Sequence, residues 1–470
     1  MAQSTTSTCT IELQPILPSA PPRVKQLTHI ERNVPDLTES VGAGRRLVDE
    51  CGTPDEPPVG AVSAKQRWNE SPSTVFRVAA VFWCFLVTGA NDAAYGPLIP
   101  KLMPYYDVSY IVVSLVFLSP FAGYVSSAIL NNYLHLKFGQ RGISIIGSLS
   151  HLTAYIIIAA HPPYVALVFA FLLAGFGNGV ADAAWNAWVG NLANSSEVLG
   201  CLHGMYGVGA VMSPFISTAM TSKANLPWYS FYYLMIGMAT LELTVLTTAF
   251  WKSSGSAYRQ KYFEDQSAQS QSGTGLWDAL FKMPASRVSW TSALFLLAYV
   301  GVEVALGGWV ATFMSQVRNQ DNFNSGMSAA GFWLGVTVGR VVLGFVTPRV
   351  GIKVAMAAYI GCAIALELVF WLVPQFIVSA VAVSLQGFFL GPMFPGVILV
   401  ASKLLPRHQH VVVIGFASAF GGCGAAIIPF VTGLLVQGSG PKVLQPIILA
   451  ILVAMLVVWL LMPRLEKKQE

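Results

Sequence analysis

The sequence predicts an all-α membrane protein with twelve transmembrane helices, arranged as two six-helix bundles. Three observations lead to this prediction. Only 10% of the 470 residues are charged and 54% are apolar, with a mean hydropathy of +0.60, whereas soluble domains carry roughly 25% charged residues. After Arg77, apolar runs of about 20 residues, long enough to cross a bilayer, follow one another. The two halves of the chain also resemble each other. This composition excludes a soluble globular enzyme.

The apolar runs set the expected order of elements. We place the helix centres near Phe85, Val116, Ser150, Gly175, Val208, Leu234, Tyr299, Leu334, Gly361, Leu385, Phe416 and Ile451. A tail rich in Ser, Thr and Pro precedes the first helix, and a Ser- and Gln-rich stretch separates the sixth from the seventh. We therefore expect a disordered cytosolic tail over 1–71, bundles over 72–251 and 287–464, a cytosolic linker over 252–286 and a short cytosolic tail over 465–470.

The basic residues orient the protein in the membrane. Loops with an excess of Lys and Arg face the cytosol, and the loops on the opposite side hold only Lys101, Lys223, Arg318 and Lys442. Both termini are therefore predicted to be cytosolic, in an integral multi-pass protein of the plasma membrane. The glycosylation sequon at Asn194 then faces the cytosol and should carry no glycan.

Several function classes find no support. The six cysteines form no CxxC pair, so neither a disulfide framework nor a metal site is expected. Basic residues are scattered over short loops, which argues against nucleic acid as a partner. The chain has no GxxxxGK[ST] loop and no nucleophile–base constellation, so ATP does not drive it directly. We expect no catalytic activity and no cofactor.

An internal repeat relates the two halves. Gly89 matches Gly301 and Gly175 matches Gly387, each 212 residues further on, and Gly209 matches Gly424 after a short insertion. Two basic loops also correspond, Lys137-Phe138-Gly139-Gln140-Arg141 and Arg349-Val350-Gly351-Ile352-Lys353. Duplicated halves in the same orientation imply a pseudo-two-fold axis along the membrane normal, with a solute cavity where the bundles meet. The spacings Gly175 to Gly179 and Gly335 to Gly339 favour close helix packing.

Ionisable residues inside apolar helices indicate where the mechanism lies. Each would cost about 2.5 to 3.5 kcal/mol if ionised at the bilayer centre, so it must face a wet cavity, pair with another group or carry a proton. The set comprises Asp92, Asp182, Glu242, Glu303, Glu367 and Arg340. Glu242 and Glu367 have no polar stripe around them and are expected to be structural.

Asp182 and Asp92 are the leading candidates for coupling a proton or another cation. Asn178, Asp182 and Asn186 recur at i, i+4 and i+8 and form one polar stripe. The alternative is that Asp182 merely bonds a neighbouring helix. Asp92 follows Asn91 and shares a face with Tyr95. We expect these two acids on opposite sides of the midplane, loading and releasing a proton as the halves rock, because low dielectric favours the neutral carboxyl and rehydration favours the carboxylate.

Other polar and aromatic residues complete the candidate site. Glu303 matches Asn91 in the repeat and could face the cavity from the opposite half. Arg340 is expected to be a structural partner for a carboxylate or a helix end. His203 could tune Asp182 from the start of the fifth helix, although a plain helix-start histidine is equally consistent. The aromatic residues considered for stacking on a solute, with core packing as the alternative, are Trp185, Trp188, Tyr95, Tyr206 and Trp309.

With these motifs, the chain resembles the major facilitator superfamily over about residues 76 to 463. Its basic loops, with the structural candidates Lys137, Gly139, Arg141, Arg340, Arg349 and Gly351, are similar to the signature of that superfamily. Asn91-Asp92, Asp182-Ala183-Ala184-Trp185-Asn186 and His203-Gly204-Met205-Tyr206-Gly207-Val208-Gly209 resemble its fucose permease and sodium-glucose transporter-like branch, which includes fungal members. The resemblance implies that the family's first-helix acid is Asp92. Fucose permeases have Glu where this chain has Asp182.

The sequence therefore predicts a secondary active transporter of a small polar, sugar-like solute, coupled to H⁺, with Na⁺ as the alternative cation. The expected solute-binding residues are Asn91, Tyr95, Asn178, Trp185, Asn186, His203, Tyr206 and Trp309, with Asp92, Asp182 and Glu303 as coupling residues. Two other interpretations are a metabolite exporter and a non-transporting sensor on a transporter scaffold. The six residues after Pro463-Arg464 argue against the sensor, and the duplicated halves argue against a channel.

Overall fold

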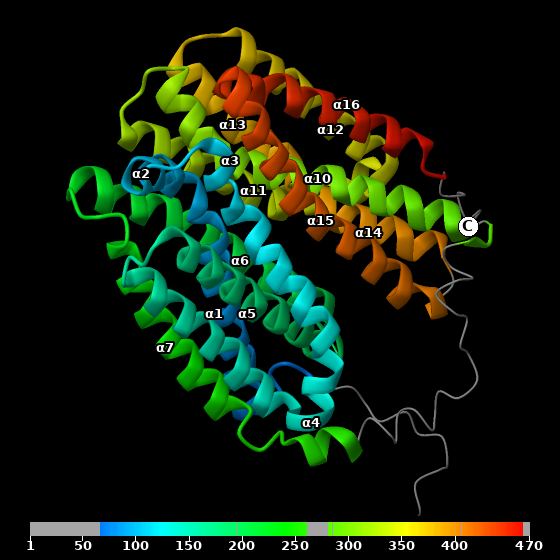
Figure 1. Cartoon of the computed structure of the whole chain (residues 1–470). Helices are drawn as coiled ribbons and strands as arrows, with labels where there is room; N and C mark the ends of the chain where they lie inside the picture. The colour runs from blue at the N-terminus through cyan, green and yellow to red at the C-terminus, as the bar shows by residue number, and fades with distance from the viewer. Residues whose placement is uncertain (1–65, 194, 261–280, 284, 406, 464–470) are drawn as a thin grey trace, which may run out of the picture. The chain divides into compact units, whose positions relative to one another are not determined.

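Every regular element in the described part of the chain is helical (Figure 1). The computed structural model describes residues 66–463 except 194, 261–280, 284 and 406, and these residues belong to one unit, Ser63–Glu470. The predicted tails, most of the predicted linker and Asn194 of the sequon lie outside the described residues.

The helices fall into two sets along the chain. The first set is α1 (Pro72–Ala93), α2 (Tyr95–Tyr106), α3 (Tyr110–Val113), α4 (Leu115–Ala159), α5 (Tyr164–Gly190), α6 (Ser195–Thr218), the π-helical turn η1 (Ala219–Lys223) and α7 (Ser230–Ala249). The second set is α10 (Ala285–Gln316), α11 (Asn322–Val350), α12 (Ile352–Leu372), α13 (Phe376–Leu390), α14 (Met393–Leu404), α15 (Arg407–Ser439), the 3₁₀ turn η2 (Pro441–Val443) and α16 (Leu444–Leu461).

Eleven helical stretches among the described residues are long and apolar enough to cross a membrane. Twelve were predicted, and the difference lies in α4, which covers two of the predicted helices. A straight helix of its 45 residues would be roughly 68 Å long, about twice the hydrocarbon thickness. At Gly139 the backbone leaves helical geometry, with φ 67° and ψ −169°. Gly123 and Gly147, on either side of this point, both pack against α5 near Gly175 and Gly177. The chain therefore turns back at Gly139, and the predicted fold class is confirmed.

The contacts repeat between the two sets. In the first set Gly179 of α5 packs against Ser127 of α4, and in the second Gly391 packs against Gly339 of α11, each partner 212 residues further on. The glycines bring the α11 and α13 backbones together, because a Cβ at Gly339 would meet the Phe388 backbone.

The two basic loops secure equivalent helix ends. The Arg141 guanidinium lies 5.2 Å from the Trp251 ring centroid, just beyond α7, and the Arg141 amide donates to Ser253 O at 3.0 Å. Its counterpart Lys353 lies 4.6 Å from the Trp459 ring centroid, and its Nζ donates to Met462 O at 2.7 Å.

The remaining loop residues lie at the turns themselves. Gly351 has φ 92°, a conformation that glycine adopts readily. Arg349 and Lys137 are exposed, and Lys137 donates to Tyr133 OH at 2.8 Å.

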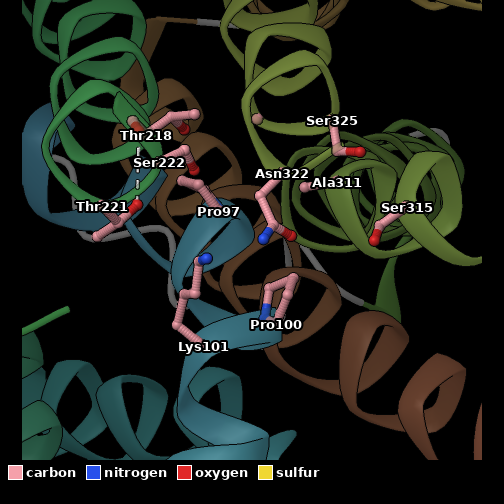
Figure 2. A pocket seen from close by; sticks show the side chains of 11 residues that line it. Pro97, Pro100, Lys101, Thr218, Thr221, Ser222, Ala311, Ser315, Asn322 and Ser325 are labelled. Atoms are coloured by element: carbon pink, nitrogen blue, oxygen red, sulfur yellow. Dashed lines mark hydrogen bonds between the residues drawn. The ribbon is translucent and has the colours of Figure 1, made fainter. Parts of the chain in front are cut away.

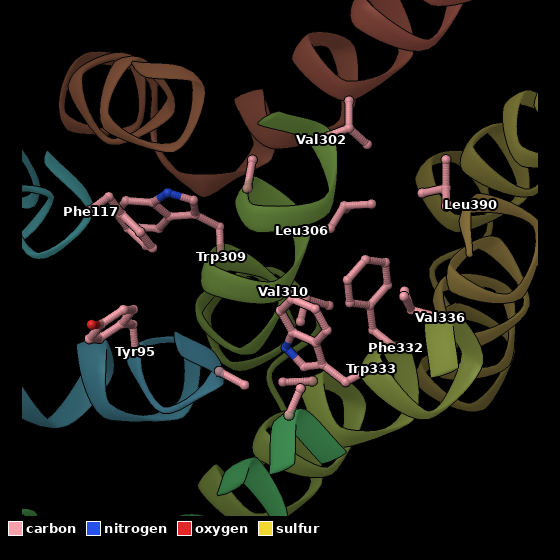
Figure 3. Close-up of a cluster of buried hydrophobic side chains, with 14 of the residues drawn as sticks. Tyr95, Phe117, Val302, Leu306, Trp309, Val310, Phe332, Trp333, Val336 and Leu390 are labelled. Carbon is pink, nitrogen blue, oxygen red and sulfur yellow. The ribbon is translucent and has the colours of Figure 1, made fainter. Parts of the chain in front are cut away.

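The two sets of helices meet at the ends predicted to be external. Gly96 of α2 packs against the Gly307 backbone of α10, and Gly433 of α15 packs against Ser114 at the start of α4. Figure 3 shows Trp309 of α10 beside Phe117 of α4, with 6.1 Å between the ring centroids. The contacts continue to mid-helix, where Gly207 of α6 meets Thr337 of α11.

Candidate functional site

A carboxylate held by three neutral donors forms the centre of the site. Asp92 of α1 accepts at Oδ1 from Asn178 Nδ2 (2.8 Å) and Asn91 Nδ2 (3.1 Å), and at Oδ2 from Tyr206 OH (3.0 Å). The side chain is half-buried. Three helices, α1, α5 and α6, thus meet at one carboxyl group, and none of these donors carries a charge that would fix Asp92 in its ionised form.

Close packing of α1 against α6 positions Tyr206 on Asp92. Gly89 of α1 lies directly against the Tyr206 backbone, and Gly209 of α6 lies against Leu86 O. A side chain at either glycine would push the helices apart. Asn91 is fully buried and also donates to Tyr95 OH at 3.0 Å, so Tyr95 supports the amide from one turn further along.

Asp182 lies one turn beyond Asn178 on α5, as the i, i+4 spacing predicts, but its partner is different. Asn186 Nδ2 donates to Asp182 Oδ1 at 2.8 Å and to Asp182 O at 2.9 Å. Asp182 is half-buried and acts electrostatically on Asp92. The polar stripe of α5 thus reaches both acids, because Asn178 bonds to Asp92 of α1 and Asp182 is itself part of the stripe.

The second set of helices contributes an ion pair. Arg340 Nη2 of α11 donates to Glu303 Oε1 of α10 at 2.6 Å and to Tyr299 OH at 3.4 Å. The side chains are 22% and 7% exposed. Tyr206 lies within electrostatic range of both charges, so the pair belongs to the same region as Asp92. This ion pair gives Glu303 a charged partner, and the coupling role expected for Glu303 stays a prediction.

Several expected solute-binding aromatics are packed away from any solute in this conformation. Trp185 is 1% exposed and stacks on Phe250 with 4.6 Å between centroids, and Trp188 meets the same ring edge-on. Trp185 therefore packs in the core between α5 and the end of α7 in this conformation, and its role as a solute contact stays a prediction. Trp309 is also 1% exposed and donates from Nε1 to Pro429 O at 3.0 Å.

His203 lies in α6, next to α1. Its exposed ring meets Phe85 edge-on at 5.7 Å, and its electrostatic neighbour is Arg340 of the second set, not Asp182. The expected tuning of Asp182 by His203 stays a prediction.

A buried acid–histidine pair was missed by sequence reasoning. Glu242 of α7 accepts from His151 Nδ1 of α4 at 3.0 Å, from Ser148 Oγ at 3.1 Å and from Cys84 Sγ at 3.1 Å. Glu242 was expected to be structural because its own helix has no polar stripe. The available signal was on α4, where Ser144, Ser148, His151 and Tyr155 recur at spacings of four, three and four. A further buried acid, Glu367, accepts from Gln386 Nε2 at 2.8 Å.

A small polar pocket lies where the two sets meet, at the end predicted to be external. Figure 2 shows Lys101 of α2 and the hydroxyls of Thr221 and Ser222 facing Asn322 and Ser325 of α11. The hydroxyl oxygens of Thr218, Ser222 and Ser325 are buried and make no hydrogen bond to any described residue.

Two repeated helical bundles, with their few ionisable groups gathered near the junction, define a secondary transporter that exposes a central site alternately to each side of a membrane. The chain matches the Major Facilitator Superfamily over residues 81–383 and 326–470 and belongs to this family. It is therefore an integral multi-pass membrane transporter of small-molecule solutes and not an enzyme.

Curated relatives cover most of the chain. Bypass of stop codon protein 6 of Saccharomyces cerevisiae is 29% identical over 423 residues, covering 85% of this chain and 84% of the relative. The glucose/mannose transporter GlcP of Bacillus subtilis is 24% identical and covers 74% of this chain and 85% of the relative. An uncharacterized MFS-type transporter of Yersinia pestis is 22% identical over 74% of this chain and 87% of the relative.

Proposed function

We propose that the protein imports a small sugar-like solute together with a proton, and that Asp92 carries the proton. The observation that supports this most directly is the donor set of Asp92. Its oxygens accept only from Asn91, Asn178 and Tyr206 among the described residues, so both the carboxylate and the carboxylic acid can be accommodated as hydration changes. Glu303, by contrast, is ion-paired with Arg340.

The position of Asp92 also supports a coupling role. Tyr206 bonds to Asp92, and the next residue, Gly207, packs against Thr337 of the second bundle. Any rocking of α6 against α11 therefore moves a donor of Asp92. A conformational change that alters the donors of a carboxyl group alters its proton affinity, which is the requirement for coupling.

The substrate class follows from the relatives and from the chemistry of the site. A relative of this chain is a glucose/mannose transporter by name. Amide and hydroxyl groups, such as those of Asn186 and Tyr206, match the alternating donors and acceptors of a sugar. Contacts between the bundles at the predicted external end support a state that is closed to the outside. The same proposal includes cytosolic termini and a location in the plasma membrane.

The test is uptake of labelled D-glucose and D-mannose into proteoliposomes that contain the purified protein. An inward proton gradient should drive accumulation, and an inward Na⁺ gradient should not. Accumulation that follows Na⁺ would reassign Asp92 and Asp182 to cation binding. If neither sugar moves in either direction, a metabolite exporter becomes the better interpretation.

A further inference from the structure

The buried acid–histidine pair of His151 and Glu242 lies next to the Asp92 site. His151 and Glu242 are both 0% exposed, and His151 Nδ1 lies 3.0 Å from Oε2 and 3.2 Å from Oε1 of Glu242. An isolated charge at such a depth is expensive. A carboxyl and an imidazole that share one proton are neutral as a pair, either as carboxylate with imidazolium or as carboxylic acid with imidazole.

One residue links this pair to Asp92. His151 Nε2 faces α5 at Gly177, the residue before Asn178. Neither His151 Nε2 nor Asn178 Oδ1 makes a hydrogen bond within the described residues, although both are buried. At its other end, the Asn178 amide donates from Nδ2 to Asp92 Oδ1 at 2.8 Å.

The two unsatisfied atoms show which protonation state fits this arrangement. When the pair holds its shared proton, Nε2 carries a hydrogen in either form and can donate to Asn178 Oδ1. The amide then keeps Nδ2 on the Asp92 carboxylate. When the pair loses that proton, Nε2 becomes an acceptor opposite another acceptor. Rotation of the amide relieves this clash and turns Oδ1 toward Asp92, which can then bond to it only as a carboxylic acid.

We propose that His151 and Glu242 are positioning residues that control proton loading at Asp92 through the orientation of the Asn178 amide. A proton on the pair favours the Asp92 carboxylate, and its loss favours a proton on Asp92. Each group exchanges its own proton with water, and the amide N–H bonds stay intact. This inference rests on the proposed role of Asp92 as proton carrier and adds a second titrating group to it.

Other titratable groups near the pair must be included in its pH response. Glu242 is also bonded to Cys84 of α1, and His151 stacks on Tyr155 at 5.9 Å. Asp92 acts electrostatically on His151, and Asp182 acts on both Cys84 and Asp92. Tyr232 of α7 acts on Tyr155.

The experiment follows the protonation of Asp92 in the full-length protein, without solute, by infrared spectroscopy of the carboxylic acid band. The band belonging to Asp92 is the one lost in Asp92→Asn. In the wild type it should titrate over a wider pH range than a single proton allows, because the pair titrates with it. In Glu242→Gln it should titrate over a narrower pH range than in the wild type, and the breadth that remains comes from Asp182. Asn178→Leu should raise the midpoint by about one pH unit, since the carboxylate loses a donor.

A double-mutant cycle separates the relay from direct electrostatics. Glu242→Gln should change the Asp92 curve in the wild type and leave it unchanged in the Asn178→Leu background. The matched control is Glu367→Gln, which removes a buried acid of the other bundle and should leave the Asp92 curve as it is. A single-proton curve for the Asp92 band of the wild type overturns the proposal. An equal effect of Glu242→Gln with and without Asn178 also overturns it.

The two proposals fail separately. If Asp92→Asn retains proton-driven uptake of D-glucose or D-mannose, the transport role of Asp92 is wrong, whatever the infrared cycle gives. If that uptake is lost but the cycle shows no coupling through Asn178, only the positioning role is wrong.

Discussion

The two bundles are related by the internal repeat, but the acids near their junction have different kinds of partner. In the first bundle Asp92 is held by an amide from each of two helices and by a tyrosine hydroxyl. In the second bundle Glu303 is held by the guanidinium of Arg340. The duplicated scaffold brings both acids to the junction, and the partner of each acid decides its chemistry. Asp92 has neutral donors only among the described residues, whereas Glu303 has a counter-charge in Arg340.

The largest expected effect on stability comes from breaking the ion pair on one side only. Glu303→Gln leaves Arg340 as a mostly buried charge without its counter-charge, which costs about 3 kcal/mol. Thermal unfolding in detergent should show a marked loss of stability. Replacing both residues, as in Glu303→Gln with Arg340→Met, should restore most of it. If the single and double variants were equally unstable, the unpaired charge of Arg340 would not be the cause of the lost stability.

Asp92→Asn should abolish uptake without lowering the thermal stability of the protein. The variant keeps an oxygen that accepts from Tyr206 or Asn178, and it removes no ion-pair partner, so its thermal stability should equal or exceed that of the wild type. Proton-driven uptake of D-glucose and D-mannose should nevertheless fall to the level of empty liposomes. Destabilisation as large as that of Glu303→Gln would contradict the contrast between the two acids.

Tyr206→Phe is expected to shift the pH dependence of uptake without abolishing it. The variant removes one donor from the Asp92 carboxylate, so the protonated form persists to higher pH. The pH of half-maximal uptake should therefore rise by about one unit. Tyr299→Phe removes a hydroxyl that accepts from Arg340 in the other bundle and serves as the control, with an unchanged pH profile.

A substitution at the closed end should change the population of states. Gly96→Ala places a methyl group against the Gly307 backbone and opposes the contact between bundles there. Cysteine introduced at Ser222, in the pocket of Figure 2, should then react faster with an impermeant maleimide added from outside. Unchanged labelling would show that the Gly96 contact does not gate this end.

The smallest expected effect is that of Trp185→Phe. Because Trp185 packs on Phe250 inside the first bundle, the variant should lower the unfolding temperature and leave the KM for D-glucose unchanged. A large rise in KM with normal stability would return Trp185 to the solute site.

The helical periodicity and the repeat made most of the fold predictable. The lengths of the apolar runs predicted the membrane-spanning helices of the described residues. The fixed spacing of glycines predicted the close α11–α13 contact. The two helices predicted near Val116 and Ser150 both lie within α4, on either side of the turn at Gly139. The stripe of Asn178, Asp182 and Asn186 was predictable, since i, i+4 spacing is a local property of one helix.

Contacts between helices were not predictable to the same degree. The joining of Asp92 to Tyr206 and the burial of Glu242 on His151 depend on how α1, α4, α6 and α7 pack, and the periodicity of a single helix contains no such information. The stacking of Trp185 is a similar case, because aromatic side chains in membrane helices serve both packing and binding.

The most direct test is the movement of protons themselves. Proteoliposomes with a pH-sensitive dye in a weakly buffered medium should show external alkalinisation when D-glucose or D-mannose is added to the wild type, and none when either is added to Asp92→Asn, with Glu367→Gln behaving as the wild type. Sugar uptake accompanied by the same alkalinisation in Asp92→Asn would contradict the assignment of Asp92 as the proton carrier.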